Sequence, residues 1–250
     1  MEHIILKKLS EIEKAENVRI LYCVESGSRA WGFASPDSDY DVRFVYVRPM
    51  DFYLRLDETR DVIEWQLDDT LDINGWDIQK AFRLLHNSNP TLFEWNSSPI
   101  VYKKTKEWDK VDKIIDRYFI NKAGIYHYLS MAKRNYSGYL KEETVRLKKY
   151  FYVLRPIFAC KWILDKQTPP PVLFSELSDI YMDGNIKSEV ERLLEIKLNT
   201  PEIASGKRID VLNDYIRRNI EEIEKAASKL PQKSAGEWSM LNELFLGFFK

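Results

Sequence analysis

The chain has 250 residues, 44% of them hydrophobic and 31% charged, a composition typical of a folded globular protein. Its 38 basic and 39 acidic residues give a formal net charge of −1, which excludes a strong overall attraction to nucleic acid or to anionic membranes. The first 14 residues lack the apolar run of a signal peptide, and no stretch approaches the roughly 20 apolar residues that cross a bilayer. We therefore expect a cytoplasmic protein that has no membrane partner. Cys23 and Cys160 lie in apolar segments and are expected to be buried free thiols.

The first part of the chain alternates strand and helix patterns. Between residues 18 and 102, short runs rich in β-branched and aromatic residues alternate with helically spaced apolar residues. We expect strands over 19–25, 40–47, 61–66 and 71–77, and helices over 5–16 and 78–87. This pattern predicts a mixed α/β sheet domain.

The second part of the chain is mostly helical in pattern. We expect helices over 111–118, 125–139, 145–164, 186–199 and 209–228. The run Pro169 to Pro171 cannot continue a helix and predicts an extended connector between two of them. The fold class is therefore α+β, with a sheet domain over 1–103 followed by an all-α domain over 104–250.

A Gly-Ser pair follows the first predicted strand. Gly27 has no Cβ, so the backbone there can approach a phosphate closely, and the helix N-terminus that begins at this point offers free amides to phosphate oxygens. By itself the pair Gly27 and Ser28 would be read as a turn with a helix cap. Together with the acidic residues downstream, it predicts a phosphate-binding turn.

Two aspartates flank Tyr40 at the start of the second predicted strand. The period of two along a strand places Asp39 and Asp41 on one face of the sheet, where two carboxylates repel each other unless a cation or a shared proton compensates. Magnesium prefers oxygen ligands and binds through one or two carboxylates plus substrate phosphates. The sequence therefore predicts an Mg²⁺ site at this pair, with Mn²⁺ as an alternative ion.

A third carboxylate would complete a site in which two metal ions hold the attacking hydroxyl and the leaving group. Asp77 is the favoured candidate, because the strand over 71–77 could end beside the aspartate pair, and Asp72 is the competitor. Arg29 and Arg43 could approach phosphate, but Arg43 lies one strand period beyond Asp41 and could instead neutralise the acidic pair.

The spacing of these residues resembles a known signature. Gly27-Ser28, ten intervening residues and Asp39-Tyr40-Asp41-Val42 are similar to the motif of the DNA polymerase beta-type nucleotidyltransferase superfamily. Further segments resemble the RNA repair pathway DNA polymerase beta family across nearly the whole chain. They are Gly75 to Lys80, Asn89 to Trp95, Ser98-Pro99, Lys148 to Tyr150 and Leu154 to Pro156.

The resemblance implies roles for individual residues. Gly27 and Ser28 would hold nucleotide phosphates, and the metal would be bound by Asp39, Asp41 and, as third carboxylate, Asp77. The helical domain would close over the nucleotide cleft. The nucleotide-binding set then comprises Gly27, Ser28, Arg29, Lys148, Lys149 and Arg155.

The implied reaction is transfer of a nucleoside monophosphate from an NTP, with ATP favoured, to an acceptor hydroxyl, with release of pyrophosphate. The family name suggests an RNA end as acceptor, although the near-neutral chain offers no independent support for extended RNA binding. A protein hydroxyl or a small molecule stays open as acceptor, and so does the oligomeric state. The alternative is a catalytically silent nucleotide-binding regulator or an antitoxin-like partner protein.

Overall fold

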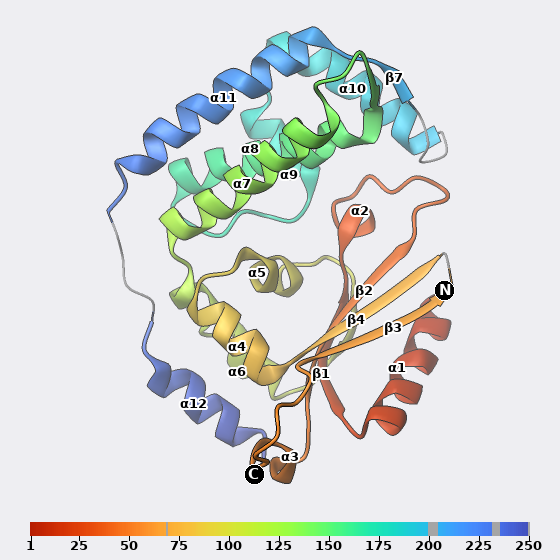
Figure 1. The fold of residues 1–250 in the computed structure, drawn as a ribbon, viewed down its shortest axis with the longest axis vertical. Coiled ribbons are helices and arrows are strands. Elements are labelled where there is room, and N and C mark those ends of the chain that lie inside the picture. Colours follow the sequence, from red (N-terminus) through yellow and green to blue (C-terminus); the bar gives the residue numbers. More distant parts are fainter. Residues whose placement is uncertain (69, 200–204, 232–235, 250) are drawn as a thin grey trace. The chain divides into compact units, whose positions relative to one another are not determined.

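The computed structural model describes residues 1–68, 70–199, 205–231 and 236–249, and its internal contacts divide the chain into two compact units (Figure 1). The first unit comprises Met1–Ala30, Asp39–Tyr118 and Ala235–Lys250, and the second comprises Trp31–Ser38 and Phe119–Ser234. The main border thus lies at residue 118 instead of 103. Two segments also belong to the unit opposite to the one expected from their position in the chain.

A five-stranded mixed sheet forms the centre of the first unit. Its strands are β1 (Arg19–Glu25), β2 (Tyr40–Val47), β3 (Val62–Asp68), β4 (Leu71–Asp77) and β5 (Val101–Lys104), in the spatial order β3-β4-β2-β1-β5. β2 and β4 run parallel, and the other neighbouring strands pair antiparallel. The strands predicted over 19–25, 40–47 and 71–77 are confirmed, whereas β5 was not predicted.

Helices cover the sheet of the first unit. They are α1 (Glu2–Glu16), α2 (Gly27–Ala30), α3 (Met50–Tyr53), α4 (Ile78–His86), α5 (Pro90–Asn96), α6 (Trp108–Asp112), a 3-10 helix over Ile115–Tyr118 and α12 (Trp238–Gly247). The start of α5 follows from its sequence: the Asn89 side chain accepts a hydrogen bond from the amide of Thr91, and Pro90 occupies the first turn.

The period-two alternation of β2 separates a core face from a polar face. Val42, Phe44 and Tyr46 are fully buried and belong to the core that Ile5 and Leu9 of α1 complete. The intervening residues of β2 point to the opposite face, so the acidic motif lies on the side of the sheet away from α1.

The second unit is a helical domain with its own core. Its helices are α7 (Asn121–Tyr139), α8 (Phe151–Lys166), α9 (Phe174–Tyr181), α10 (Gly184–Asn199) and α11 (Asp210–Ser228), with a 3-10 helix over Leu147–Tyr150 and a small ladder of β6 (Thr144–Arg146) and β7 (Ser205–Lys207). The helix predicted over 145–164 begins later, at Phe151, because residues 144–146 pair with β7 instead. Pro169 to Pro171 lie between α8 and α9, as expected for a connector.

Two further expectations concern buried thiols and membrane spans. Cys23 and Cys160 are both buried and free, which confirms the prediction made for them. Among the helices in the described part of the chain, none combines the length and the apolar composition that a membrane crossing needs.

Candidate active site

Gly27 opens the turn after β1 and lies directly against Asp41. Its φ of +59° is in the left-handed region that favours glycine. A Cβ at this position would lie 1.9 Å from Oδ2 of Asp41 and 2.8 Å from Cγ of the same carboxylate. The glycine is therefore required both by backbone conformation and by the close approach of the carboxylate.

The main chain of Asp41 is held on both sides by the residues that precede the turn. Its amide donates to Oε1 of Glu25 at 2.8 Å, and its carbonyl accepts from the amide of Ser26 at 2.8 Å. These bonds connect the end of β1 to the start of β2. The relative position of the Gly27 turn and the Asp41 carboxylate is thus set by backbone contacts as well as by side chains.

Glu25 is a fully buried carboxyl at the end of β1. The Tyr102 hydroxyl on β5 donates to its Oε2, and the Ser98 hydroxyl donates to its main-chain carbonyl at 2.6 Å. Burial raises the pKa of Glu25 above its usual range, while the hydrogen bond from Tyr102 acts in the opposite direction. Glu25 therefore anchors the first strand of the motif to the second.

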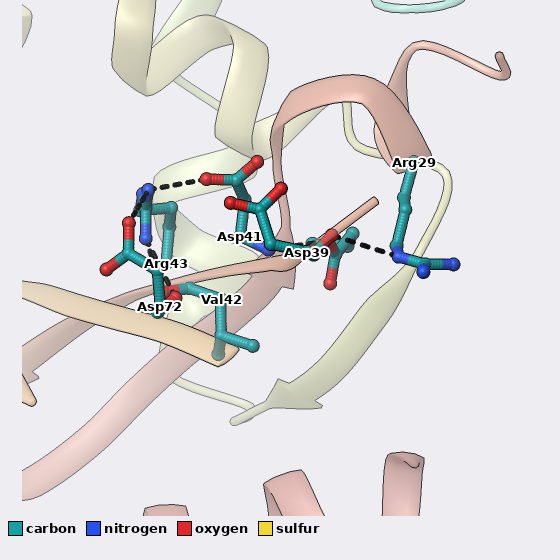
Figure 2. A network of polar contacts seen from close by, with 7 residues as sticks. Arg29, Asp39, Asp41, Val42, Arg43 and Asp72 are labelled. Carbon is teal, nitrogen blue, oxygen red and sulfur yellow. Dashed lines mark hydrogen bonds and ion pairs between the residues drawn. The ribbon is translucent and has the colours of Figure 1, made fainter. Parts of the chain in front are cut away.

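Asp39 has an exposed side chain at the edge of the sheet where β2 begins. Within the described part of the chain, its carboxylate has no hydrogen-bond or ion-pair partner, and Figure 2 shows it next to the carboxylate of Asp41. Arg29 contacts the main chain of Asp39 instead, since its Nε donates to the carbonyl at 3.0 Å while its guanidinium stacks 3.7 Å from the centre of the Tyr40 ring. The Asp39 carboxylate is thus available to a ligand.

Arg43 joins Asp41 to Asp72. One guanidinium nitrogen lies 2.8 Å from Oδ1 of Asp41 and 2.7 Å from Oδ2 of Asp72. Asp72 is the partner of Asp41 in the parallel β2/β4 register, so the two side chains point to the same face of the sheet. Of the two roles considered for Arg43, neutralisation of the acidic residues is the one that these contacts support.

Asp77 lies elsewhere, and its prediction as the third carboxylate is wrong on geometric grounds. In the β2/β4 register it pairs with Tyr46, five residues along the strand from the pair of Asp41 and Asp72. Five residues of strand span about 16 Å, and the odd number turns the side chain to the other face. Asp77 instead caps α4, with Oδ1 accepting from the amide of Gln79 at 2.8 Å and Oδ2 accepting from the Tyr53 hydroxyl at 2.8 Å.

This position predicts a stability role for Asp77. Asp77→Ala is expected to lower the free energy of unfolding by about 1–2 kcal/mol, because the helix loses its capping acceptor and Tyr53 loses a partner. Asp77→Asn, which retains a capping oxygen, should lose less. Urea unfolding measures both variants, and manganese binding measured beside it should be unchanged. A loss of metal binding with unchanged stability would return Asp77 to the active site.

The pH dependence of the asparagine variant gives a second test of this position. Burial raises the pKa of Asp77 above the ordinary value of 3.8, so the folded protein binds this proton more tightly than the unfolded chain. The stability that protonated Asp77 contributes is therefore complete at low pH and is lost as the pH rises through the folded-state pKa. Asp77→Asn removes this loss, so its unfolding free energy relative to the parent should rise as the pH is raised above the ordinary aspartate pKa of 3.8. A constant difference would contradict this.

The carboxylates of the site are the candidate ligand set for a divalent ion. Among the described residues, no group of three or more His, Cys, Asp and Glu side chains is placed to hold a metal ion. Asp39 and Asp41 nonetheless offer adjacent oxygen ligands, and magnesium commonly completes such a set with substrate phosphates and water. The donor set therefore fits magnesium or manganese bound together with a nucleotide.

Lys148, Lys149 and Arg155 lie in the helical unit. Lys149 lies over the rings of Tyr139 and Tyr152, with its ammonium 4.1 Å and 4.6 Å from their centres. Arg155 is only 1% exposed: its Nε donates to the carbonyl of Val172 at 3.3 Å, and its guanidinium lies 4.7 Å from the centre of the Trp31 ring. Contact of these basic residues with a nucleotide stays a prediction.

Sequence reasoning overlooked Glu25 and ranked Asp72 second. Leu71-Asp72-Ile73 repeats the apolar-acid-apolar pattern found at Tyr40-Asp41-Val42, and this repeat is the signal that could have favoured Asp72. Glu25 carried a weaker signal, since an acid at a strand end is ordinarily solvated.

Comparisons with known proteins identify a family and two similar proteins. Residues 1–247 match the family described as RNA repair pathway DNA polymerase beta family. The uncharacterized protein YcgL of Bacillus subtilis strain 168 is 45% identical over 248 residues, which cover 98% of this chain and 95% of YcgL. A solved nucleotidyltransferase-like protein from Exiguobacterium sibiricum aligns with 98% of this chain and 89% of its own, at 15% identity and a TM-score of 0.32. Because the family match covers residues 1–247, the chain belongs to the RNA repair pathway DNA polymerase beta family.

Proposed function

We propose that the protein is a metal-dependent nucleotidyltransferase that moves a nucleoside monophosphate from an NTP, with ATP favoured, to an acceptor hydroxyl. The observation that carries this proposal is the exposed Asp39 carboxylate, which has no partner among the described residues and lies beside an Asp41 that is held against the Gly27 turn. Two adjacent carboxylates beside this turn provide oxygen ligands for an ion to which nucleotide phosphates could also bind. The family to which the chain belongs supplies the reaction class.

Each residue of the site has a part in the proposed reaction. Asp39 and Asp41 would hold Mg²⁺, which would neutralise charge on the triphosphate. Gly27 and Ser28 contact phosphate oxygens. Asp72, whose side chain is half exposed beside Asp41, accepts the hydrogen bond of the acceptor hydroxyl and takes its proton. The hydroxyl oxygen bonds to the α-phosphorus as the bond from that phosphorus to the β-phosphate oxygen breaks, and pyrophosphate leaves.

The proposed acceptor is the hydroxyl of an RNA end. The support for it is the wording of the family description, which names an RNA repair pathway. The balanced charge of the chain gives no separate argument for RNA, so a protein hydroxyl or a small molecule is tested beside it.

The test follows the α-phosphate. The protein is incubated with Mg²⁺, ATP labelled at the α- or γ-phosphate, and separate pools of RNA 3′ ends, protein and small hydroxyl compounds. Label from the α-phosphate should enter an acceptor while label from the γ-phosphate leaves as pyrophosphate. ATP binding without labelled product from any pool would sink the enzyme proposal and favour the catalytically silent nucleotide-binding regulator.

A further inference from the structure

The Arg43 guanidinium lies where an ion bridging Asp41 and Asp72 would lie. Its Nη2 atom is 2.8 Å from Oδ1 of Asp41 and 2.7 Å from Oδ2 of Asp72. Two-metal phosphoryl-transfer sites hold their second ion between carboxylates of this kind. Figure 2 shows the contacts that join Arg43 to Asp41 and to Asp72.

The main chain also holds the guanidinium. Its Nη1 atom donates to the carbonyl of Val42 at 3.1 Å and to the carbonyl of Asp72 at 3.0 Å. These carbonyls belong to β2 and β4, which are neighbours in the sheet. Arg43 is therefore fixed by two carboxylates and two backbone oxygens, and its side chain is only 18% exposed.

The Arg43 guanidinium carries a positive charge. A metal ion entering between Asp41 and Asp72 would have to displace a cation held by four acceptors, all of them on the sheet. On the other side of Asp41, the carboxylate of Asp39 has no partner within the described residues. A carboxylate offers about four lone-pair positions, so Asp41 can ligate an ion there while it keeps Arg43.

We propose that Arg43 takes the place of a second metal ion, so that the site binds one divalent ion through Asp39 and Asp41. This inference rests on the proposed nucleotidyltransferase function. Arg43 is then a positioning residue: it holds Asp72 out of the metal coordination sphere, aims it at the acceptor hydroxyl and carries the positive charge on that side. Asp72 accepts the proton of the acceptor hydroxyl and does not ligate the ion.

The experiment counts bound manganese. Free Mn²⁺ is measured by electron paramagnetic resonance while the ion is titrated into the full chain with an equimolar nonhydrolysable ATP analogue. We expect one Mn²⁺ per chain, and also one for Asp72→Asn, because the substitution removes no direct ligand of the ion. Asp41→Asn should weaken binding by about tenfold or more. Asp116→Asn, at an exposed position of the same unit, is the matched control and should change nothing.

Arg43→Met supplies the complementary test. Removal of the guanidinium leaves Asp41 and Asp72 without their shared cation, and we expect a second Mn²⁺ to bind. If Arg43→Met does not fold, the number of Mn²⁺ ions bound by the parent and by Asp72→Asn is enough to test the proposal. Two ions in the parent and one in Asp72→Asn would overturn the inference.

The number of bound ions and the label transfer together distinguish failure of the role proposed for Arg43 from failure of the proposed nucleotidyltransferase function. Label transfer accompanied by two bound ions would leave the nucleotidyltransferase proposal standing and remove the role given to Arg43. Absence of both metal binding and label transfer would remove the proposed function, and the inference with it.

Discussion

Asp39→Asn and Asp41→Asn are each expected to reduce label transfer from ATP by about a thousandfold or more. Each substitution removes one of two ligands for an ion whose charge stabilisation is worth several kcal/mol in the transition state, and about 4 kcal/mol corresponds to three powers of ten in rate. The measurement is initial velocity at saturating ATP and Mg²⁺, with the Mn²⁺ affinity determined beside it.

The two aspartates should differ in their effect on stability. Asp39 is exposed and its carboxylate has no partner in the described part of the chain, so Asp39→Asn should leave the unfolding free energy nearly unchanged. Asp41→Asn weakens the ion pair with Arg43 and should cost about 1 kcal/mol. Asp116→Asn serves as the control for both. Full turnover by either active-site variant would eliminate the proposed mechanism.

Gly27→Ala is expected to abolish metal binding and transfer and to lower the unfolding free energy by about 2–4 kcal/mol. The left-handed backbone at φ +59° penalises a side chain, and the new methyl group would lie 1.9 Å from Oδ2 of Asp41. The Asp41 carboxylate must therefore move, which disturbs its position toward Asp39 and Arg43. Urea unfolding and the Mn²⁺ titration measure the two effects separately.

Gly138→Ala is the matched control for this substitution. Gly138 lies in α7, and a Cβ there would meet nothing within 4 Å. Alanine has a higher helix propensity than glycine, so Gly138→Ala should stabilise the protein by about 0.5–1 kcal/mol and leave label transfer from ATP unaffected. An alanine at position 27 that was tolerated as well as one at position 138 would contradict the contact between Gly27 and Asp41.

The paired acids could be predicted because strand periodicity is local. The alternation along β2 is readable from Tyr40 to Val47 and places Asp39 and Asp41 on one face without any knowledge of neighbouring strands. The third carboxylate could not be assigned in this way. Choosing Asp72 over Asp77 requires the register between β2 and β4, which depends on how two separate segments pair.

The role of Glu25 depended on the tertiary structure for a related reason. Its burial follows from β5 pairing beside β1, which brings the Tyr102 hydroxyl to its side chain. The burial of Arg155 in the helical unit could not be predicted from the sequence either. A basic residue on a helix suggests a solvated or ligand-binding face, yet the Arg155 guanidinium is buried against Trp31 and Val172. In both cases the deciding contacts join residues far apart in the chain.

The sequence by itself determined the family, the α+β class, three complete strands and the motif of Gly27, Ser28, Asp39 and Asp41. These features depend on spacing within short segments, where backbone periodicity controls the direction of side chains. The tertiary structure alone decided that Asp72 accompanies Asp41, that Asp77 caps a helix and that Arg43 connects two strands. Register and burial arise from the pairing of distant segments, and the local pattern of the sequence does not encode that pairing.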